Sequence, residues 1–254
     1  MALAVIFDLE ETLIQTPWSN RQHVLEFRAN TRQQLVKLGI PATLLEGIER
    51  ATIMRNKASD YVEQHFSKAE TVKFNREMEK FLCHYEQDSA NQSKLFFQTI
   101  PMLKTLREMG ARIGLVTNTS KKTVKTIFQK YHLENYFDVI VTREDVEKLK
   151  PDPEGILLAI KKLGVTRSFM VGDLAVDVLA AKSVNIPAIL VSRYPEKSKP
   201  QDLLKNLPAE VLEKTRRSIT ETGSLQVDYV VQSLAEIPAI IQADERKNHY
   251  TPDK

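Results

Sequence analysis

The chain opens with an uninterrupted apolar run, residues 3–7 (Leu-Ala-Val-Ile-Phe), which ends at the carboxylate of Asp8. Short apolar runs rich in β-branched and aromatic residues are typical of the buried strands of a parallel sheet. Open α/β sheets bind their ligands in the crevice at the carboxyl ends of such strands, so Asp8 is expected to point into a crevice. An aspartate in this place can equally cap a turn, and the run alone does not separate the two interpretations.

After residue 96 the pattern alternates between strands and helices. Apolar runs predict strands at residues 111–117, 138–142, 168–171, 188–191 and 228–231. Helices are expected to begin near Pro101, Ser120, Pro153 and Ala175. This alternation predicts right-handed crossovers and a doubly wound parallel sheet, the Rossmann-like class of α/β folds. Residues 193–226 are long for a connection and leave two interpretations open, an extra helix pair or a partner surface.

Residues 17–96 differ from the rest because their periodicity is helical, with no convincing strand. A first helix is expected over residues 19–38, with Ser19 or Asn20 as its N-cap and Gly39 at its end. Further helices are expected over residues 42–66, continuous or broken, and over residues 69–88. Amphipathic helices of this kind bury their apolar stripes against one another. We therefore expect an all-helical cap domain over residues 17–96, inserted into a core made of residues 1–16 and 97–254.

The composition is that of an ordinary globular protein, with 42% hydrophobic and 27% charged residues, so it does not choose between an enzyme and a binding module. The 36 basic and 33 acidic side chains are mixed along the chain, which argues against a nucleic-acid partner. No apolar stretch reaches the ~20 residues of a membrane span, and the lone Cys83 cannot form an internal disulfide. We expect a cytoplasmic protein without nucleic-acid or membrane partners, and the oligomeric state is left open.

Polar side chains follow three of the expected strands. They are Asp8, Glu10 and Thr12 after the first, Thr117 and Asn118 after the second, and Asp173 and Asp177 after Gly172. Because parallel strands share one carboxyl edge, these groups are expected to meet at one crevice. Carboxylates brought together repel one another unless a cation lies between them, and their hard oxygens suit Mg²⁺. Gly172 is expected to let the backbone turn sharply, so that Asp173 faces the crevice.

Lys150 lies in the segment Lys-Leu-Lys-Pro-Asp-Pro at residues 148–153. Because it precedes a proline and an expected helix start, it should be held in an extended conformation near a helix N-terminus. A cation beside the N–H groups of a helix N-terminus can bind phosphate, although a lysine by itself is more often a solvated surface charge.

In order and spacing these motifs resemble the haloacid dehalogenase superfamily, and within it the phosphoglycolate-phosphatase-like subgroup with a C1-type helical cap. The matching motifs are a strand followed by Asp8-x-Glu10-x-Thr12, a strand ending in Thr117-Asn118, Lys150-Pro-x-Pro, and Gly172-Asp173-x-x-x-Asp177. The resemblance implies a phosphatase that hydrolyses a small phosphorylated metabolite through an aspartyl-phosphate on Asp8.

The resemblance also implies a role for each matching residue. Mg²⁺ would be held by Asp8, the backbone carbonyl of Glu10 and Asp173, with Asp177 supporting the metal or Lys150. The phosphoryl oxygens would be bound by Lys150, the hydroxyl of Thr117 and the backbone N–H groups of Leu9 and Asn118. The side chain of Asn118 could equally satisfy local backbone groups.

Glu10 departs from the pattern, because phosphatases of this family usually have aspartate there to protonate the leaving oxygen and then to activate water. Glutamate keeps the carboxyl chemistry but changes its reach, and a misplacement of about 1 Å can cost roughly a hundredfold in rate. The substitution therefore threatens turnover more than binding. The alternatives are a catalytically slow phosphate-binding or regulatory protein, a phosphomutase of the same fold, and a dehalogenase, which the acid pair Asp173 and Asp177 disfavours.

Substrate identity is expected to depend on the cap. Arg28 lies on the stripe of the first expected helix that includes Val24, Thr31 and Leu35, and Arg21 lies two turns before it. We hypothesise that Arg28 or Arg21 meets an anionic part of the substrate, such as a carboxylate. A solvated or structural role is the alternative for both arginines.

Overall fold

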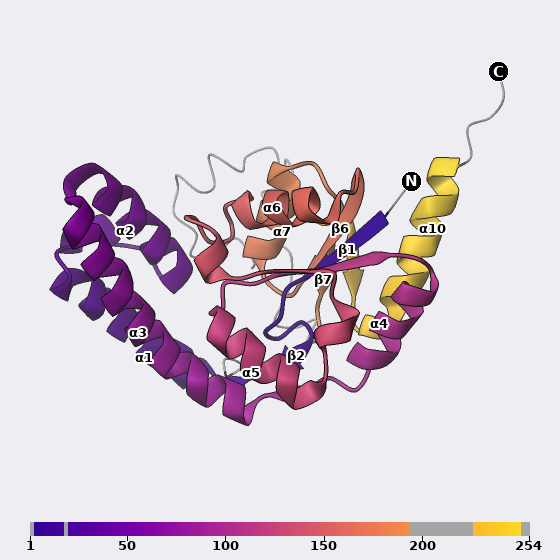
Figure 1. The fold of residues 1–254 in the computed structure, drawn as a ribbon, viewed down its shortest axis with the longest axis horizontal. Coiled ribbons are helices and arrows are strands. Elements are labelled where there is room, and N and C mark those ends of the chain that lie inside the picture. The colour runs from indigo at the N-terminus through magenta and orange to yellow at the C-terminus, as the bar shows by residue number, and fades with distance from the viewer. Residues whose placement is uncertain (1–2, 18–19, 194–225, 250–254) are drawn as a thin grey trace, which may run out of the picture.

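The computed structural model describes residues 3–17, 20–193 and 226–249. Its centre is a six-stranded parallel sheet in the order β5-β4-β1-β6-β7-β8 (Figure 1). The strands are β1 (Leu3–Phe7), β4 (Arg112–Val116), β5 (Val139–Val141), β6 (Arg167–Gly172), β7 (Ala188–Val191) and β8 (Tyr229–Val231). β1 has strands on both sides and packed helices on both faces. It is therefore buried all round, which explains why it contains no polar side chain.

The direction of the chain across the sheet reverses beside β1. From β1 the chain proceeds to β4 and β5 on one side, and then to β6, β7 and β8 on the other. Phe7 at the end of β1 is in register with Leu115 of β4 and Val171 of β6. The carboxyl ends of these three strands therefore lie side by side at a topological switch point, the place where open α/β sheets bind ligands.

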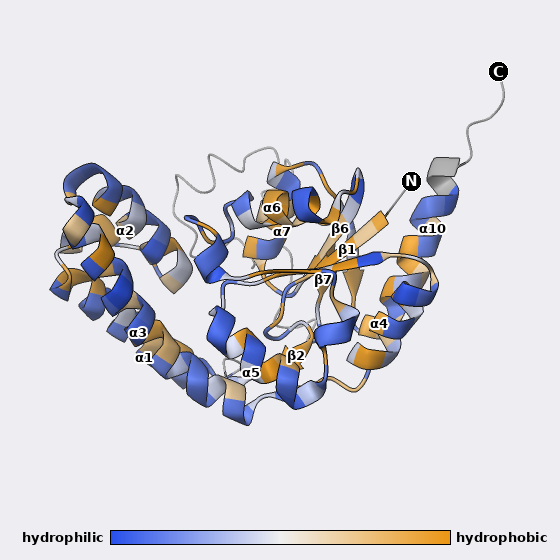
Figure 2. Ribbon diagram, viewed as in Figure 1, coloured by the Kyte–Doolittle hydropathy of each residue, from blue (hydrophilic) through white to orange (hydrophobic). Residues whose placement is uncertain are grey.

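Helices cover both faces of the sheet. The first face is covered by α6 (Glu154–Leu163) and α7 (Ala175–Ser183), and the second by α4 (Thr99–Glu108), α5 (Lys121–Tyr131) and α10 (Ile237–His249). Side chains of β1 alternate between the two cores: Ala4 and Ile6 lie in the first, and Val5 and Phe7 in the second. Figure 2 shows the apolar residues gathered along the strands and on the inner sides of the helices.

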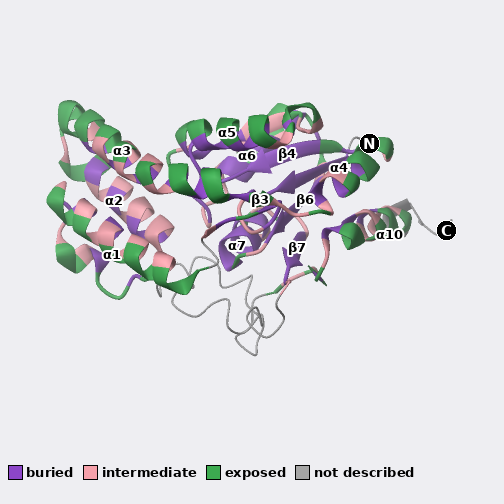
Figure 3. Ribbon diagram, turned by 90° about the horizontal axis from the view of Figure 1, so that it is seen from below, coloured by how far each residue is buried: buried purple, intermediate pink, exposed green. Residues whose placement is uncertain are grey.

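A layer of three further helices lies beyond the carboxyl edge of the sheet, at the left of Figure 1. These helices are α1 (Arg21–Lys37), α2 (Ala51–His65) and α3 (Lys68–Gln92). Asn20 caps α1 by accepting the backbone N–H of Gln22 at 2.9 Å, and Ser67 caps α3 in a capping box with Glu70. The helices bury their facing apolar side chains against one another, while their outer sides are exposed (Figure 3).

Short elements complete the described part of the chain. β2 (Ile14–Gln15) and β3 (Lys94–Leu95) form an antiparallel ribbon. The chain leaves the sheet for the helical layer through β2 and returns through β3. The 3-10 helices are η2 (Ala42–Leu45), η3 (Glu134–Tyr136), η4 (Arg143–Asp145) and η6 (Leu234–Glu236). No helix within the described ranges combines the length and the apolar character that crossing a membrane requires.

The predicted fold class, a doubly wound parallel sheet with an all-helical insert, is confirmed, and the differences concern the ends of elements. The helix expected to begin at Pro101 starts at Thr99, since a proline is tolerated in the first turn, where N–H groups have no helical partner. The helix expected over residues 42–66 is divided into η2 and α2, and the third cap helix continues to Gln92. The ribbon was not predicted because two-residue strands carry no periodic pattern.

Two expectations fall outside the described residues. Ser19 is one, so Asn20 is the N-cap that the structure shows. The other is the interpretation of residues 193–226, of which 194–225 are not described. The division into a core of residues 1–16 and 97–254 and a cap of residues 17–96 stays a prediction.

Candidate active site

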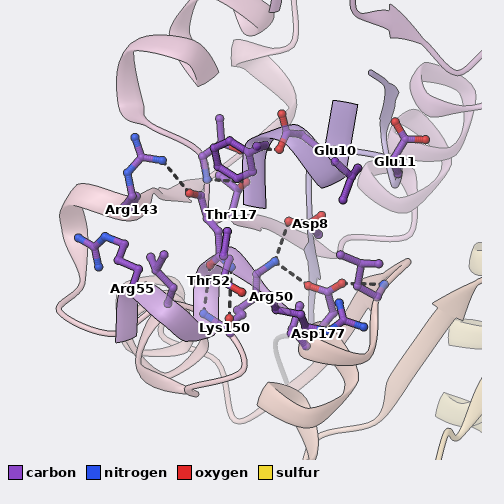
Figure 4. A pocket seen from close by; sticks show the side chains of 18 of the residues that line it. Asp8, Glu10, Glu11, Arg50, Thr52, Arg55, Thr117, Arg143, Lys150 and Asp177 are labelled. Carbon is purple, nitrogen blue, oxygen red and sulfur yellow. Dashed lines mark hydrogen bonds and ion pairs between the residues drawn. The ribbon is translucent and has the colours of Figure 1, made fainter. Parts of the chain in front are cut away.

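The ends of β1, β4 and β6 bring three predicted site residues together. Asp8 follows β1 and donates its backbone N–H to Val171 at 2.9 Å, and Thr117 follows β4 and donates its own to Val141 at 3.0 Å. Asp173 follows β6, and Asp8, Thr117 and Asp173 all line one cavity of about 470 Å³ between the sheet and the helical layer. Figure 4 shows Asp8 and Thr117 in this cavity. The predicted convergence at one edge is therefore what the backbone pairing produces.

Lys150 is buried at the centre of this edge. Its Nζ donates to Oδ1 of Asp8 at 2.6 Å, to Oδ1 of Asp177 at 2.6 Å and to the backbone oxygen of Val116 at 2.8 Å. Burial alone would lower the pKa of the lysine, but the carboxylates of Asp177 and Asp8 outweigh it and raise that pKa. Lys150 is therefore a fixed ammonium group beside Asp8, and not a solvated surface charge.

Three carboxylates lie close together around this lysine. Oxygens of Asp8, Asp173 and Asp177 all fall within 4.8 Å of one another. Burial raises the pKa of Asp8 from 3.8 to about 6, with Lys150 opposing the rise and Asp177 adding to it. Burial, Asp177 and Asp8 together raise the pKa of Asp173 well above its usual range. The cluster thus holds more negative charge than Lys150 alone can neutralise.

The donor set fits Mg²⁺. Three carboxylates against one ammonium leave a formal charge of −2 when all are ionised, and hard carboxylate oxygens are the ligands that this cation prefers. Asp177 accepts from Lys150 through Oδ1 and from the backbone N–H of Leu174 through Oδ2, so both of its oxygens are engaged. Asp173 accepts only the hydroxyl of Thr12, at 3.2 Å, among the described residues. Asp8 and Asp173 are therefore the better candidates for direct ligands.

Gly172 has a different purpose from the predicted one. Its φ is not positive, so no sharp turn that only glycine allows occurs there. A Cβ at this position would instead lie 2.3 Å from Cγ of Asp177. The glycine leaves room for the Asp177 side chain to turn back against the end of β6 and reach Lys150, which is a requirement for space and not for conformation.

The predicted phosphate-binding residues Thr117 and Asn118 both line the cavity. The hydroxyl oxygen of Thr117 accepts the backbone N–H of Thr119 at 3.2 Å. The side chain of Asn118 pairs with the backbone of Lys150: Oδ1 accepts its N–H at 3.1 Å, and Nδ2 donates to its carbonyl at 3.3 Å. Of the two roles considered for the Asn118 side chain, the structure shows the satisfaction of backbone groups, which holds the Lys150 loop in place.

Glu10 and Glu11 line the same cavity but are held differently. Glu10 accepts the hydroxyl of Thr119 at 3.0 Å and has a long contact of 3.5 Å with the hydroxyl of Ser89 on α3. Glu11 adopts a positive φ of 55° and accepts both the backbone N–H and the hydroxyl of Thr16, at 2.7 and 2.8 Å. Glu11 closes the turn after β1, so Glu10 is the carboxylate of this turn that remains for chemistry.

Arginines of the helical layer form the opposite wall of the cavity. Arg28, one of the two predicted substrate residues, lines it and lies 3.7 Å from Glu49, whereas Arg21 is exposed on α1 and is not among the lining residues. Arg50, at the start of α2, was not predicted. Its Nε is buried, and its guanidinium has no hydrogen bond or ion pair to any described residue. Burial and the neighbouring Arg28 lower its pKa.

Arg143 in η4, also not predicted, joins the helical layer to the sheet. It is 2% exposed and forms ion pairs with Glu79 and Glu86 of α3, the first at 2.9 Å. It also donates to the backbone oxygen of Asn118 at 3.0 Å. Glu79 and Glu86 are seven residues apart and therefore lie on one face of α3. This spacing is the feature of the sequence from which a common basic partner could have been predicted.

Comparison with known proteins gives a consistent result. The family model described as haloacid dehalogenase-like hydrolase matches residues 5–191, and a HAD-hydrolase-like model matches residues 149–237. A phosphoglycolate phosphatase of Salmonella typhi is 28% identical over 189 residues, which are 74% of this chain and 73% of that protein. A protein of Caldanaerobacter subterraneus subsp. tengcongensis provisionally named pyrophosphatase PpaX is 25% identical over 248 residues, 97% of each chain. The crystal structure of a HAD phosphatase from Thermococcus onnurineus is 25% identical with a TM-score of 0.50, covering 95% of this chain and 98% of that one.

Proposed function

This chain belongs to the haloacid dehalogenase-like hydrolase family, and we propose that it is a Mg²⁺-dependent phosphatase that acts through an aspartyl-phosphate on Asp8. The observation that carries the proposal is the position of Lys150, whose Nζ lies 2.6 Å from Oδ1 of Asp8 and 2.6 Å from Oδ1 of Asp177 at the bottom of the cavity. A carboxylate attacks a phosphoryl group only where positive charge offsets the charge of that group, and Lys150 supplies it beside the attacking oxygen.

The chain supplies the parts of a two-step transfer. In the first step a carboxylate oxygen of Asp8 bonds to phosphorus, the bond from phosphorus to the leaving oxygen breaks, and that oxygen takes the proton of the Glu10 carboxyl. In the second step a water molecule gives a proton to Glu10 and bonds to phosphorus while the bond from phosphorus to the Asp8 oxygen breaks, which releases inorganic phosphate and restores Asp8. Glu10 thus acts first as an acid and then as a base, and both carboxyl groups end as they began.

Charge on the phosphoryl oxygens is met by several groups. Lys150 and the hydroxyl of Thr117 are placed to bind them, with the backbone N–H groups of Leu9 and Asn118. The Thr117 oxygen accepts a backbone N–H, so its own proton remains for donation. Mg²⁺ held by Asp8, Asp173 and the backbone carbonyl of Glu10 would neutralise further charge on the phosphoryl group.

The arginine wall supports a substrate with a second anionic group. The buried Nε of Arg50 has no hydrogen-bond partner among the described residues, and an anion that enters the cavity would supply one. Arg50 and Arg28 line the wall opposite the carboxylates, so a small substrate can place its phosphoryl group at Lys150 and a second anion at Arg50. Phosphoglycolate and pyrophosphate, named for two relatives, both have this character.

The test is phosphate release from a panel of esters, with and without Mg²⁺. The panel contains phosphoglycolate, pyrophosphate, ethyl phosphate and 4-nitrophenyl phosphate. We expect Mg²⁺-dependent release by the wild type, none by Asp8→Asn, and unchanged release by Asp88→Asn, an exposed aspartate of α3 that serves as the matched control. Release that persists in Asp8→Asn would exclude the nucleophile. In a parallel assay with a sugar phosphate added as acceptor, transfer of the phosphoryl group to that sugar phosphate would indicate a phosphomutase. A wild type inactive in every assay would indicate a binding protein.

A further inference from the structure

The backbone around Glu10 is fixed from several sides. Glu10 forms an isolated β-bridge with Ile14, and Leu13 donates its N–H to the oxygen of Leu9 at 2.9 Å. The guanidinium of Arg193 donates to the backbone oxygens of Glu11 and Thr12, at 2.5 and 2.7 Å. Because the turn itself is held, the place of the Glu10 carboxylate is decided by the rotamers of its side chain and by the groups that bind it.

Two hydroxyl groups that contact the Glu10 carboxylate come from different layers of the molecule. Oε2 accepts the hydroxyl of Thr119, from the loop after β4, at 3.0 Å. Oε1 lies 3.5 Å from the hydroxyl of Ser89, on helix α3 of the cap layer. Thr119 and Ser89 are 3% and 1% exposed, so neither hydroxyl can move far. Of these two contacts, the one from the sheet side is the shorter and the one from the cap is the longer.

Thr119 is itself tied to the phosphoryl site. Its backbone N–H donates to the hydroxyl oxygen of Thr117 at 3.2 Å, and its carbonyl accepts the backbone N–H of Arg143 at 3.2 Å. The cap side is tied to the same loop, because Glu86, one helical turn before Ser89, accepts the N–H of Ser120 at 3.1 Å. Any change in the position of this loop or of α3 is therefore passed to the Glu10 carboxylate.

We propose that Thr119 is the positioning residue for Glu10, with Ser89 of the cap as its second contact, and that this pair is why glutamate serves at a place usually held by aspartate. The proposal rests on the proposed function, in which Glu10 protonates the leaving oxygen. An aspartate carboxylate would sit one carbon–carbon bond, about 1.5 Å, closer to the backbone and would not reach the Thr119 hydroxyl. The longer side chain and its hydroxyl partner work together, so one has its effect only when the other is present.

The readout is the dependence of kcat/KM on the leaving group. Ethyl phosphate releases an alkoxide that must be protonated as it departs, whereas 4-nitrophenyl phosphate releases a stabilised phenolate that needs no proton from the enzyme. Thr119→Val, which keeps the shape and removes the hydroxyl, should lower kcat/KM for ethyl phosphate by about 10- to 100-fold and that for 4-nitrophenyl phosphate by less than about threefold. Thr119→Ser should restore the activity, and Ser89→Ala should cause a smaller loss of the same kind.

The control is the same substitution in a Glu10→Asp background. Thr119→Val should have no further effect there, since the shorter carboxylate has no bond to Thr119 to lose, and thermal unfolding of each variant confirms that it is folded. Equal losses on both esters, or a loss that persists in the Glu10→Asp background, would overturn the proposal while leaving the phosphatase function intact. A wild type that hydrolyses none of the four esters of the panel would overturn both, so the two failures are distinguishable. If Thr119→Val does not fold, the comparison is made with Ser89→Ala and Thr119→Ser.

Discussion

Without a divalent cation, the acidic cluster should make the protein less stable as the pH rises. Burial raises the pKa of Asp8 from 3.8 to about 6 in the folded protein. The folded state therefore holds this proton more tightly than the unfolded chain, so the stabilisation is complete below pH 3.8 and is lost as the pH rises through about 6. At 1.36 kcal/mol per pH unit, the difference amounts to ~3 kcal/mol in the free energy of unfolding.

A practical range for the measurement is about pH 5 to about pH 8, where carboxylates with lowered pKa values are already ionised. Roughly one pH unit of this range lies below the folded-state pKa of Asp8, so its contribution should fall by about 1.4 kcal/mol. For a domain of this size that corresponds to about 3–6 °C in Tm. The raised pKa of Asp173, caused by burial and by Asp177, acts in the same direction. Saturating Mg²⁺ should therefore stabilise the protein more at the upper pH than at the lower.

The assay is urea unfolding followed by circular dichroism, in EDTA and in MgCl₂, across this range. Asp8→Asn should remove the Asp8 part of the pH dependence, and the exposed control Asp88→Asn should keep it. Wild type and Asp8→Asn differ only in this side chain, so the difference between their pH dependences isolates the contribution of the buried carboxyl. A pH dependence that is identical in wild type and Asp8→Asn, or a Mg²⁺ effect that is equal at both ends of the range, would refute the reasoning.

Two further predictions concern the arginines around the cavity. Arg50→Ala should raise the KM for phosphoglycolate about 10- to 100-fold and hardly change the KM for ethyl phosphate, because a hydrogen bond to a charged group is worth ~1.5–3 kcal/mol. Arg76→Ala, at an exposed arginine, is the control. Equal changes in KM for both esters would argue against a site for a second anion. Arg143→Ala should lower the free energy of unfolding in urea by ~3–5 kcal/mol, because Glu86 would lose its buried cation. Arg107→Ala, which removes an exposed ion pair, should lower it by ~1 kcal/mol or less. Similar losses in the two variants would contradict the buried pairing.

The carboxylate side of the site could be predicted because its geometry follows from chain order. Asp8, Thr117 and Asp173 each come directly after an apolar run, and parallel strands bring such positions to one edge whatever the loops between them do. Lys150 could be placed there only through the family resemblance, since a lysine before a proline has no strand to fix it. The structure shows that Lys150 donates to Asp8, Val116 and Asp177, and the sequence alone gives no sign of the contact with Val116.

The arginine side could not be predicted in the same way, because it depends on how the helices pack against the sheet. Arg50 follows a short loop and precedes α2, and nothing in that stretch indicates which face turns toward the cavity. Arg28 and Arg21 lie seven residues apart on one helix, yet only Arg28 lines the cavity, and Arg21 is exposed at the first residue of α1. Helix periodicity gives a face but not the point along the helix where that face meets a ligand.

The two walls of the cavity have opposite charge, and this restricts how a substrate can enter. The sheet side holds Asp8, Asp173 and Asp177 against one Lys150, while the cap side presents Arg50 without a partner among the described residues. When all three carboxylates are ionised, the sheet side repels a phosphate dianion and the cap side attracts it, so charge alone would turn the phosphoryl group away from Asp8. The productive orientation therefore requires that the sheet-side carboxylates be neutralised first. In the proposed function, a second anion on the substrate would occupy Arg50, which would remove the competing site for the phosphoryl group and leave it at Lys150.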